Sequence, residues 1–201
     1  MDKDRVTILN NEKYLRKTSR EVDFNDKTYL ENIKKLEKYC KENEVFAMAA
    51  IQIGIPKRII YLKNTTTDFS KNAEANYNEA KVMINPVILE REGHTRFLEG
   101  CASCLTEEGK YICSIIDRPY RVVVKYYDMN GIQKEERLEG FETVVFSHEN
   151  DHLNGILHFD LVEEKEIIPL TKEEMKNFRE KNPYEMISKT CNYEEITNKK
   201  R

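Results

Sequence analysis

The chain has 201 residues with 33 Lys or Arg and 36 Asp or Glu, so its formal net charge is −3 at pH 7. This length predicts one domain with a substantial core over residues 1–201, and the small negative charge gives no electrostatic case for a DNA partner. No apolar run approaches the length of a membrane span and the first residues contain no apolar signal core, so we expect a cytoplasmic protein without membrane contact.

The N-terminal third contains the first predicted helix, over residues 28–44. Leu30, Ile33, Leu36 and Tyr39 recur there at helical spacing, and Asp26 precedes them as a suitable N-cap. The next polar stretch, residues 64–80, has no periodicity and is predicted to be a long exposed loop between strands.

The middle of the chain is rich in short β-like runs. Residues 58–62, 81–89 and 119–127 contain many Val, Ile and Tyr residues, which favour strands. The Asn-Gly pair at 130–131 predicts a tight turn into a returning strand over 132–138. These runs predict an antiparallel or mixed sheet.

The last part of the chain is predicted to be helical. Residues 141–153 have buried-helix character, with Gly155 as a C-terminal stop. Residues 171–201 are predicted to form a charged C-terminal helix that frays after Pro183. The fold class is therefore α+β, with antiparallel or mixed sheets around a central helix and a further helix near each terminus.

The central helix carries the most informative motif of the chain. His148 and His152 are four residues apart, so a helix places both imidazoles on one face, within reach of a single metal ion. Glu149 between them can transfer protons for a metal-bound water. A catalytic divalent metal usually takes three protein ligands and keeps a position open for water, so a third ligand is needed.

Cys101 is the best candidate for that third ligand. It follows Glu99 and Gly100, and we expect the glycine to let the backbone turn closely. A thiolate with two imidazoles suits zinc or ferrous iron better than magnesium or calcium. The competing interpretation is that Cys101 is only a small buried residue, because free cysteines are among the most buried residue types.

The five cysteines are odd in number and irregularly spaced, which argues against a disulfide framework. Cys101 and Cys104 form a Cys-x-x-Cys pair, so a closed zinc site with both thiols and both histidines stays open as an alternative. The simplest interpretation of Cys104 is a strand residue in an aliphatic position.

Three blocks of the sequence together resemble the peptide deformylase family of metal hydrolases. They are VFAMAAIQ at residues 45–52, EGCAS at 99–103 and HENDHLNG at 148–155, in the order that the family has them. The similarity extends from about residue 15 to residue 160. Such a resemblance implies an enzyme that removes the N-formyl group from the formyl-methionine of nascent polypeptides.

The resemblance also implies roles for the motif residues. Cys101, His148 and His152 would hold one divalent metal, with Fe²⁺ as the first choice and Zn²⁺, Ni²⁺ or Co²⁺ as substitutes. The metal-activated water would attack the formyl carbon, with Glu149 as the general acid and base.

The other motif residues would stabilise the oxyanion and form the pocket. The side-chain amide of Gln52 and the backbone N–H of Ala102 would be the oxyanion donors. Glu99 and Asp151 would support the ligands from behind. The pocket would be lined by residues of the first two blocks, namely Val45, Phe46, Ala47, Glu99 and Gly100.

The chain departs from the family pattern at several pocket positions. Val45 and Ala47 replace two glycines, and Ala102 replaces a larger aliphatic residue. Every chemical group survives while the pocket walls change, which indicates a divergent deformylase with altered or weakened substrate handling. Two alternatives stay open: a deformylase-like protein that binds metal or formyl-peptide ends without useful turnover, and another metallohydrolase or peptidase with the His-Glu-x-x-His motif.

The resemblance further implies an N-formylated nascent peptide as the partner, with transient contact to the ribosome. The basic end at residues 198–201 could touch such an RNA-rich partner, although a solvated terminus is the simpler account. We expect a monomer.

Overall fold

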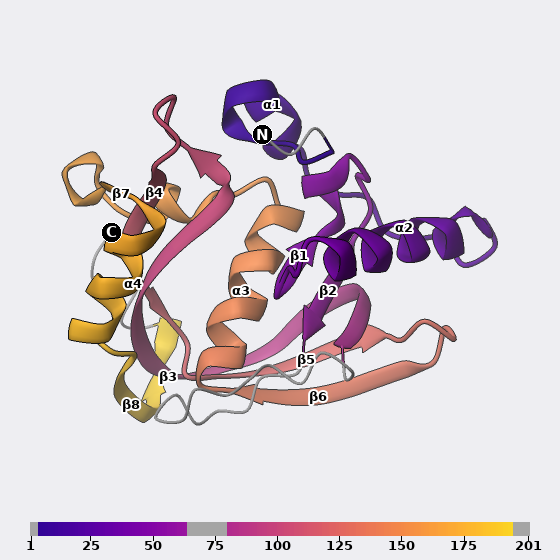
Figure 1. Cartoon of the computed structure of the whole chain (residues 1–201). Helices are drawn as coiled ribbons and strands as arrows, with labels where there is room; N and C mark the ends of the chain where they lie inside the picture. The colour runs from indigo at the N-terminus through magenta and orange to yellow at the C-terminus, as the bar shows by residue number, and fades with distance from the viewer. Residues whose placement is uncertain (1–3, 64–79, 195–201) are drawn as a thin grey trace.

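The computed structural model describes residues 4–63 and 80–194 of the chain. Four helices lie in this part (Figure 1): α1 (Ile8–Leu15), α2 (Thr28–Glu42), α3 (Phe141–Leu153) and α4 (Lys172–Lys181). Short 3-10 helices are η1 (Ala50–Ile53), η2 (His158–Leu161) and η3 (Glu164–Glu166). The strands are β1 (Ala47–Ala49), β2 (Ile59–Lys63), β3 (Ala80–Leu105), β4 (Tyr111–Arg118), β5 (Arg121–Tyr127), β6 (Gln133–Glu139), β7 (Ile168–Leu170) and β8 (Glu185–Asn192).

Strand β3 organises the sheet. Its first half pairs with β2 and β5 and its second half with β8 and β4, in every case antiparallel. The other strands extend these ladders, with β1 on β2, β6 on β5 and β7 on β4. Figure 1 shows α3 at the centre, between the β1–β2 side and the β3–β4 side of the molecule. The predicted α+β fold with antiparallel strands around a central helix is confirmed.

Helix α3 covers the residues that the sequence predicted, 141–153. Phe146 and Leu153 are buried and pack against strand residues, which holds the helix against the sheet. Gly155 follows with a φ of +73°, and a Cβ atom there would lie 2.3 Å from the carbonyl oxygen of Arg16. Only glycine allows the chain after α3 to pass this close to Arg16, the C-cap residue of α1. Contact with α1 therefore determines where α3 ends.

Two apolar clusters fix the scaffold on either side of β1. Helix α2 packs Ile33, Leu36 and Tyr39 into one cluster with β2, and α3 packs Phe146 and Leu153 into the other with β5 and β6. Each buried side chain of this size contributes roughly 1.5–3 kcal/mol relative to an exposed one. The 28–44 helix prediction is confirmed to within two residues. The predicted N-cap is wrong by one residue, because Lys27 is the N-cap, although the Asp26 carboxylate accepts the N–H of Thr28 at 3.0 Å.

Some elements differ from the sequence prediction. Helix α1 and strand β4 were not predicted. The charged helix of the tail is present as α4, but the prediction that the chain frays after Pro183 is wrong for residues 185–192. These residues form β8, because the edge of β3 at residues 92–96 offers its backbone groups for pairing. Residues 64–79 of the predicted loop lie outside the described residues, and a single domain over 1–201 stays a prediction.

None of the helices in the described ranges 4–63 and 80–194 has the length and apolar character that crossing a membrane would require.

Candidate metal and active site

The sulfur of Cys101 and the rings of His148 and His152 come together beside α3. Cys101 lies near the end of β3, and the two histidines are one turn apart on the helix. Their ligand atoms all lie within 4.8 Å of one another, and Cys101 Sγ is 3.4 Å from His152 Nε2. Among the residues that the structure describes, Cys101, His148 and His152 form the group of His, Cys, Asp or Glu side chains whose ligand atoms lie close enough together to bind one metal ion.

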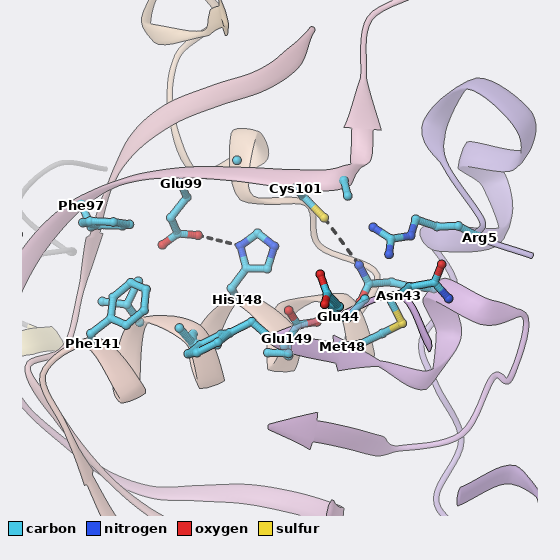
Figure 2. Close-up of a pocket in the computed structure, with 18 of the residues that line it drawn as sticks. Arg5, Asn43, Glu44, Met48, Phe97, Glu99, Cys101, Phe141, His148 and Glu149 are labelled. Atoms are coloured by element: carbon cyan, nitrogen blue, oxygen red, sulfur yellow. Dashed lines mark hydrogen bonds and ion pairs between the residues drawn. The ribbon is translucent and has the colours of Figure 1, made fainter. Parts of the chain in front are cut away.

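Glu99 orients His148 from behind. Its Oε2 lies 2.8 Å from Nδ1 of His148 (Figure 2). Arg118 donates from Nε and Nη2 to the same carboxylate at 2.8 and 2.9 Å, and its Nη1 donates to Asp151 at 2.6 Å. Because Nδ1 is engaged, Nε2 is the ring nitrogen of His148 that can bind a metal.

The charge of Glu99 is stabilised by this network. Burial alone raises the pKa of a carboxyl group, but Arg118 and His148 hold the pKa of Glu99 well below its usual value. Glu99 therefore stays ionised, and it couples the helix that carries His148 and Asp151 to strands β3 and β4. Glu99 and Asp151 thus lie behind the three candidate ligands.

The donor set fits a borderline or soft divalent ion. A hydrogen bond from Cys104, with the imidazoles of His152 and His148, holds the pKa of the Cys101 thiol well below its ordinary value despite burial. The thiolate is the form of cysteine that binds metals. Nδ1 of His152 is buried and has no hydrogen-bond partner among the described residues, so Nε2 is the nitrogen directed to the site. One thiolate and two imidazoles favour Zn²⁺ or Fe²⁺ over Mg²⁺.

Cys104 does not join the three converging donors. It is fully buried in β3 and packs with Leu15 and Leu157 in a small apolar cluster that also contains Cys101. The group of ligand atoms within 4.8 Å contains Cys101, His148 and His152 only. The geometry therefore favours three protein ligands with an open position over a closed four-ligand zinc site.

Glu149 and Gln52 share one backbone donor. The N–H of Ala49 donates to Oε2 of Glu149 at 2.8 Å and to Oε1 of Gln52 at 2.9 Å. This fixes the amide of Gln52 so that Nε2 points the other way, where it donates to Ser103 Oγ at 3.2 Å and to Cys101 Sγ at 3.5 Å. Burial raises the pKa of Glu149, which suits a group that accepts and returns a proton.

A cleft with a cavity of about 520 Å³ opens beside these groups. Figure 2 shows Arg5 at one end and Phe97 and Phe141 at the other, with His148 and Glu149 between them. The pocket residues predicted from the first two blocks all line this cleft: Val45, Phe46, Ala47, Glu99 and Gly100. Gln52, Cys101 and Ala102 line it as well.

Other residues of the cleft were not identified from the sequence. Phe141, Val144 and Val145 precede His148 on α3 by seven, four and three residues. Helical spacing from the motif could have found them. Arg5 and Arg179 come from opposite ends of the chain, and no local pattern indicated either of them.

Gly100 allows β4 and α4 to pack closely against β3. The prediction that this glycine allows a close turn of the backbone is wrong. Its φ is not positive. A Cβ atom at this position would lie 2.9 Å from Cys113 Sγ on β4 and 3.1 Å from Met175 Sδ on α4. The missing side chain therefore lets β4 and α4 approach the strand that carries Cys101.

Val45 and Ala47 do not occupy glycine conformations. Among the described residues, the non-glycine residues with positive φ are Glu44 and Asn85. The backbone of this block therefore needs no glycine, and the two replacements act through the volume of their side chains in the cleft.

His158 is a neighbour of the site that the sequence did not indicate. Its ring centroid lies 5.4 Å from that of His148, and its Nε2 donates to the carbonyl oxygen of Ile112 at 2.8 Å. Burial, followed by the nearby His148, lowers the pKa of His158 to about 4. His158 is therefore a neutral ring that supports His148 from the side.

Comparisons with known proteins agree on one family. The family model described as polypeptide deformylase matches residues 5–167. The peptide deformylase of Finegoldia magna is 30% identical over 169 residues, which span 84% of this chain and 92% of the relative. The peptide deformylase of Halalkalibacterium halodurans is 35% identical over 127 residues, 63% of this chain and 65% of the relative.

Solved structures give the same result. The peptide deformylase of Thermotoga maritima superposes with a TM-score of 0.61 at 30% identity, covering 78% of this chain and 94% of that one. A probable peptide deformylase from synechococcus phage S-SSM7 superposes with a TM-score of 0.62 at 31% identity, covering 78% and 97%.

Proposed function

Because this chain belongs to the polypeptide deformylase family, we propose that it hydrolyses the formamide bond of N-formylated peptides. Water adds to the formyl carbon, the C–N bond breaks, and formate and a free amino terminus are released. The observation that carries the proposal is the convergence of three ligand atoms with the Glu149 carboxyl and the Gln52 amide in one cleft.

Cys101, His148 and His152 would hold the metal, and the donor chemistry supports Fe²⁺ or Zn²⁺. When bound, a divalent ion lowers the pKa of water and polarises a carbonyl group. Glu99 and Arg118 keep the His148 ring oriented for this ion.

Glu149 would move the proton. Its Oε2 is held by the Ala49 N–H, which leaves Oε1 for the attacking water. That oxygen would take the proton of the water and deliver it to the departing amine nitrogen, so that the amine leaves neutral. The raised pKa of Glu149 supports both halves of this transfer.

Gln52 and the backbone N–H of Ala102 would stabilise the oxyanion. The Gln52 amide is already oriented by Ala49, and its Nε2 would exchange one of its contacts to Cys101 Sγ and Ser103 Oγ for the formyl oxygen. Ala102 follows Cys101 and lines the cleft. A backbone donor is unaffected by the small side chain at this position.

The substrate class would be a formyl-methionyl peptide. The cleft runs between β1 and β3, and its floor contains Val144, Val145 and Phe141. An apolar floor beside the candidate metal suits the side chain of the first residue, and the strands on both sides offer backbone groups to the peptide. Transient ribosome contact, a monomeric state and a cytoplasmic location stay predictions.

A second candidate is a deformylase-like protein that binds formyl-peptide ends with little turnover. The observation that favours it is the pair of side chains, Val45 and Ala47, that line the cleft where the family has glycines. A hydrolase for unformylated peptides is a weaker alternative, because Cys101 and Gln52 belong to the deformylase arrangement.

The test is formate release from a formyl-Met tripeptide by anaerobically purified, iron-loaded protein. Glu149→Gln should lower kcat by at least about 100-fold because it removes the proton acceptor. Glu142→Gln is a matched control on the same helix, outside the cleft, and should retain activity. No formate release from fully metal-loaded protein would reject the hydrolase in favour of the binding protein.

A further inference from the structure

Helix α4 contributes to the cleft although it lies outside residues 5–167, which the family model matches. Met175 lies close to Gly100, and Arg179 lines the end of the cleft next to Phe97 and Phe141. Any effect of α4 on substrate selection therefore depends on the contacts that α4 itself makes.

Arg179 is fixed on β3 by two contacts. Its Nε and Nη2 donate to the carbonyl oxygen of Leu98 at 3.1 and 2.9 Å, and its guanidinium carbon lies 4.9 Å from the centroid of the Phe97 ring. A guanidinium has five N–H donors. Both N–H groups of Nη1 are therefore left without a protein acceptor in the described part of the chain.

The charge of Arg179 also has no carboxylate partner among the described residues. The buried acid in this region, Glu99, is already bound by Arg118 and His148. A partly buried guanidinium that keeps free donors is well suited to a carboxylate, which it binds through charge-assisted hydrogen bonds.

The position of Arg179 relative to β3 determines which ligand can reach it. Strand β4 pairs with one edge of β3 from Thr95 to Gly100 and again at Leu105 after a register shift, whereas β8 pairs with the other edge only up to Arg96. The carbonyl oxygen of Leu98 accepts from Arg179 of α4, and this contact assigns it to the second edge, away from β4. Backbone groups alternate between the two edges, so Gly100 faces the same way, into the cleft.

Gly100 and Leu98 are two strand residues apart, which corresponds to about 7 Å. A peptide that lies along this edge beside Gly100 would therefore reach Arg179 about 7 Å from the point where it passes Gly100. A second cavity of about 950 Å³ adjoins the cleft across Phe97, Phe141 and Arg179 and gives room for a longer group. Lys172 and Lys176 line this second cavity together with Glu173 and Glu180, so the charges of these four side chains cancel and Arg179 is the cation that remains.

We propose that Arg179 is a specificity-determining residue that binds a carboxylate of the peptide substrate. The inference rests on the proposed deformylase function. The carboxylate is supplied either by an acidic side chain that follows the formyl-methionine or by the C-terminus of a short peptide. Both sources present a carboxylate to Arg179, and the choice of peptide substrate distinguishes one from the other.

The experiment compares peptides that differ only in charge. Formyl-Met-Glu-Ala amide is compared with formyl-Met-Gln-Ala amide, and formyl-Met-Ala-Ala acid with its amide. We expect kcat/KM to be about tenfold higher for the acid of at least one pair, the size that a charge-assisted hydrogen bond supports. Equal values within both pairs would overturn the proposal.

Substitutions test whether Arg179 causes the preference for the acidic peptide. Arg179→Gln should bring the acid-to-amide ratio close to one, and Arg179→Lys should leave an intermediate ratio, because a lysine keeps the charge without the planar fork. Lys181→Gln removes the same charge from α4 at a position that lines neither cavity, and it should leave the ratio unchanged. A ratio that survives in Arg179→Gln, or falls equally in Lys181→Gln, would reject the assignment.

The two proposals fail in different ways. If none of the four formyl peptides is hydrolysed, the proposed function fails. Dissociation constants of the same four peptides, measured calorimetrically with the metal-loaded protein, then still test Arg179. An acid-to-amide affinity ratio near tenfold that disappears in Arg179→Gln would support it, and a ratio of one would reject it.

Discussion

The carboxylate of Glu99 lies 2.8 Å from Nδ1 of His148, and the guanidinium of Arg118 holds both of its oxygens. This contact determines which nitrogen of His148 faces Cys101, because the nitrogen engaged by the carboxylate cannot also bind a metal. Glu99 and Cys101 lie on the same strand, so the strand supplies both a candidate ligand and the group that orients another one.

Replacing Glu99 should therefore weaken metal binding without removing a ligand. We expect Glu99→Gln to lower the affinity for Zn²⁺ by about 10- to 100-fold, because the neutral amide no longer polarises the imidazole. Chelator competition at pH 7.5 measures this change. Glu90→Gln, on the exposed part of the same strand, is the control and should bind like the unmodified protein. Equal affinities in both variants would contradict the role of Glu99.

The two neighbouring cysteines should differ in their effect on metal content. Cys101→Ala should lose most of the metal and all hydrolysis, because it removes one of three ligands. Cys104→Ala should keep one equivalent of metal, since Cys104 is not one of the three ligands and contributes only buried packing and a hydrogen bond to Cys101. Metal analysis of protein purified with each substitution measures the difference. Loss of metal in Cys104→Ala would point to the closed four-ligand zinc site.

Enlarging the cleft should increase turnover. Val45→Gly combined with Ala47→Gly should raise kcat/KM for a formyl-Met tripeptide by about tenfold, because both side chains narrow the cleft. The same change should lower the melting temperature, since each glycine adds roughly 0.5–1 kcal/mol of unfavourable chain entropy. Ala80→Gly removes a methyl group outside the cleft and controls for general loosening. An unchanged rate would mean that the pocket is built around Val45 and Ala47.

The free energy of unfolding should depend on His158 at acid pH. The pKa of this residue is about 4 in the folded chain, compared with an ordinary value of about 6.5. Between these values the unfolded chain binds a proton that the folded chain does not. The neutral His158 ring therefore makes its full contribution to the free energy of unfolding above about pH 6.5. As the pH falls, proton binding to the unfolded chain lowers the free energy of unfolding, by about 3 kcal/mol at pH 4.

Urea denaturation of the metal-free protein at pH 7 and pH 4.5 measures this contribution. His158→Phe keeps a ring beside His148 but cannot bind the proton, so it should lose about 2–3 kcal/mol less between the two pH values than the unmodified chain. Identical losses in the two proteins would show that His158 is not the group that titrates.

Local patterns were sufficient for much of the fold. The helices over 28–42 and 141–153 and the turn at 130–131 have signals within a few residues, namely apolar spacing, flanking glycines and an Asn-Gly pair. Strand β8 was missed because its existence depends on a free edge of β3, which is a distant segment of the chain. A pattern that only a partner strand makes stable cannot be recognised locally.

The sequence by itself determined which chemical groups the site contains: two histidines one helical turn apart, a glutamate between them, and a cysteine and a glutamine in two further blocks. Only the tertiary structure decided how these groups are oriented and what surrounds them. Glu99 and Arg118 orient His148, the N–H of Ala49 orients both Glu149 and Gln52, and α4 brings Arg179 to the cleft. Orientation depends on contacts between residues far apart in the chain, and such contacts follow from packing rather than from local spacing.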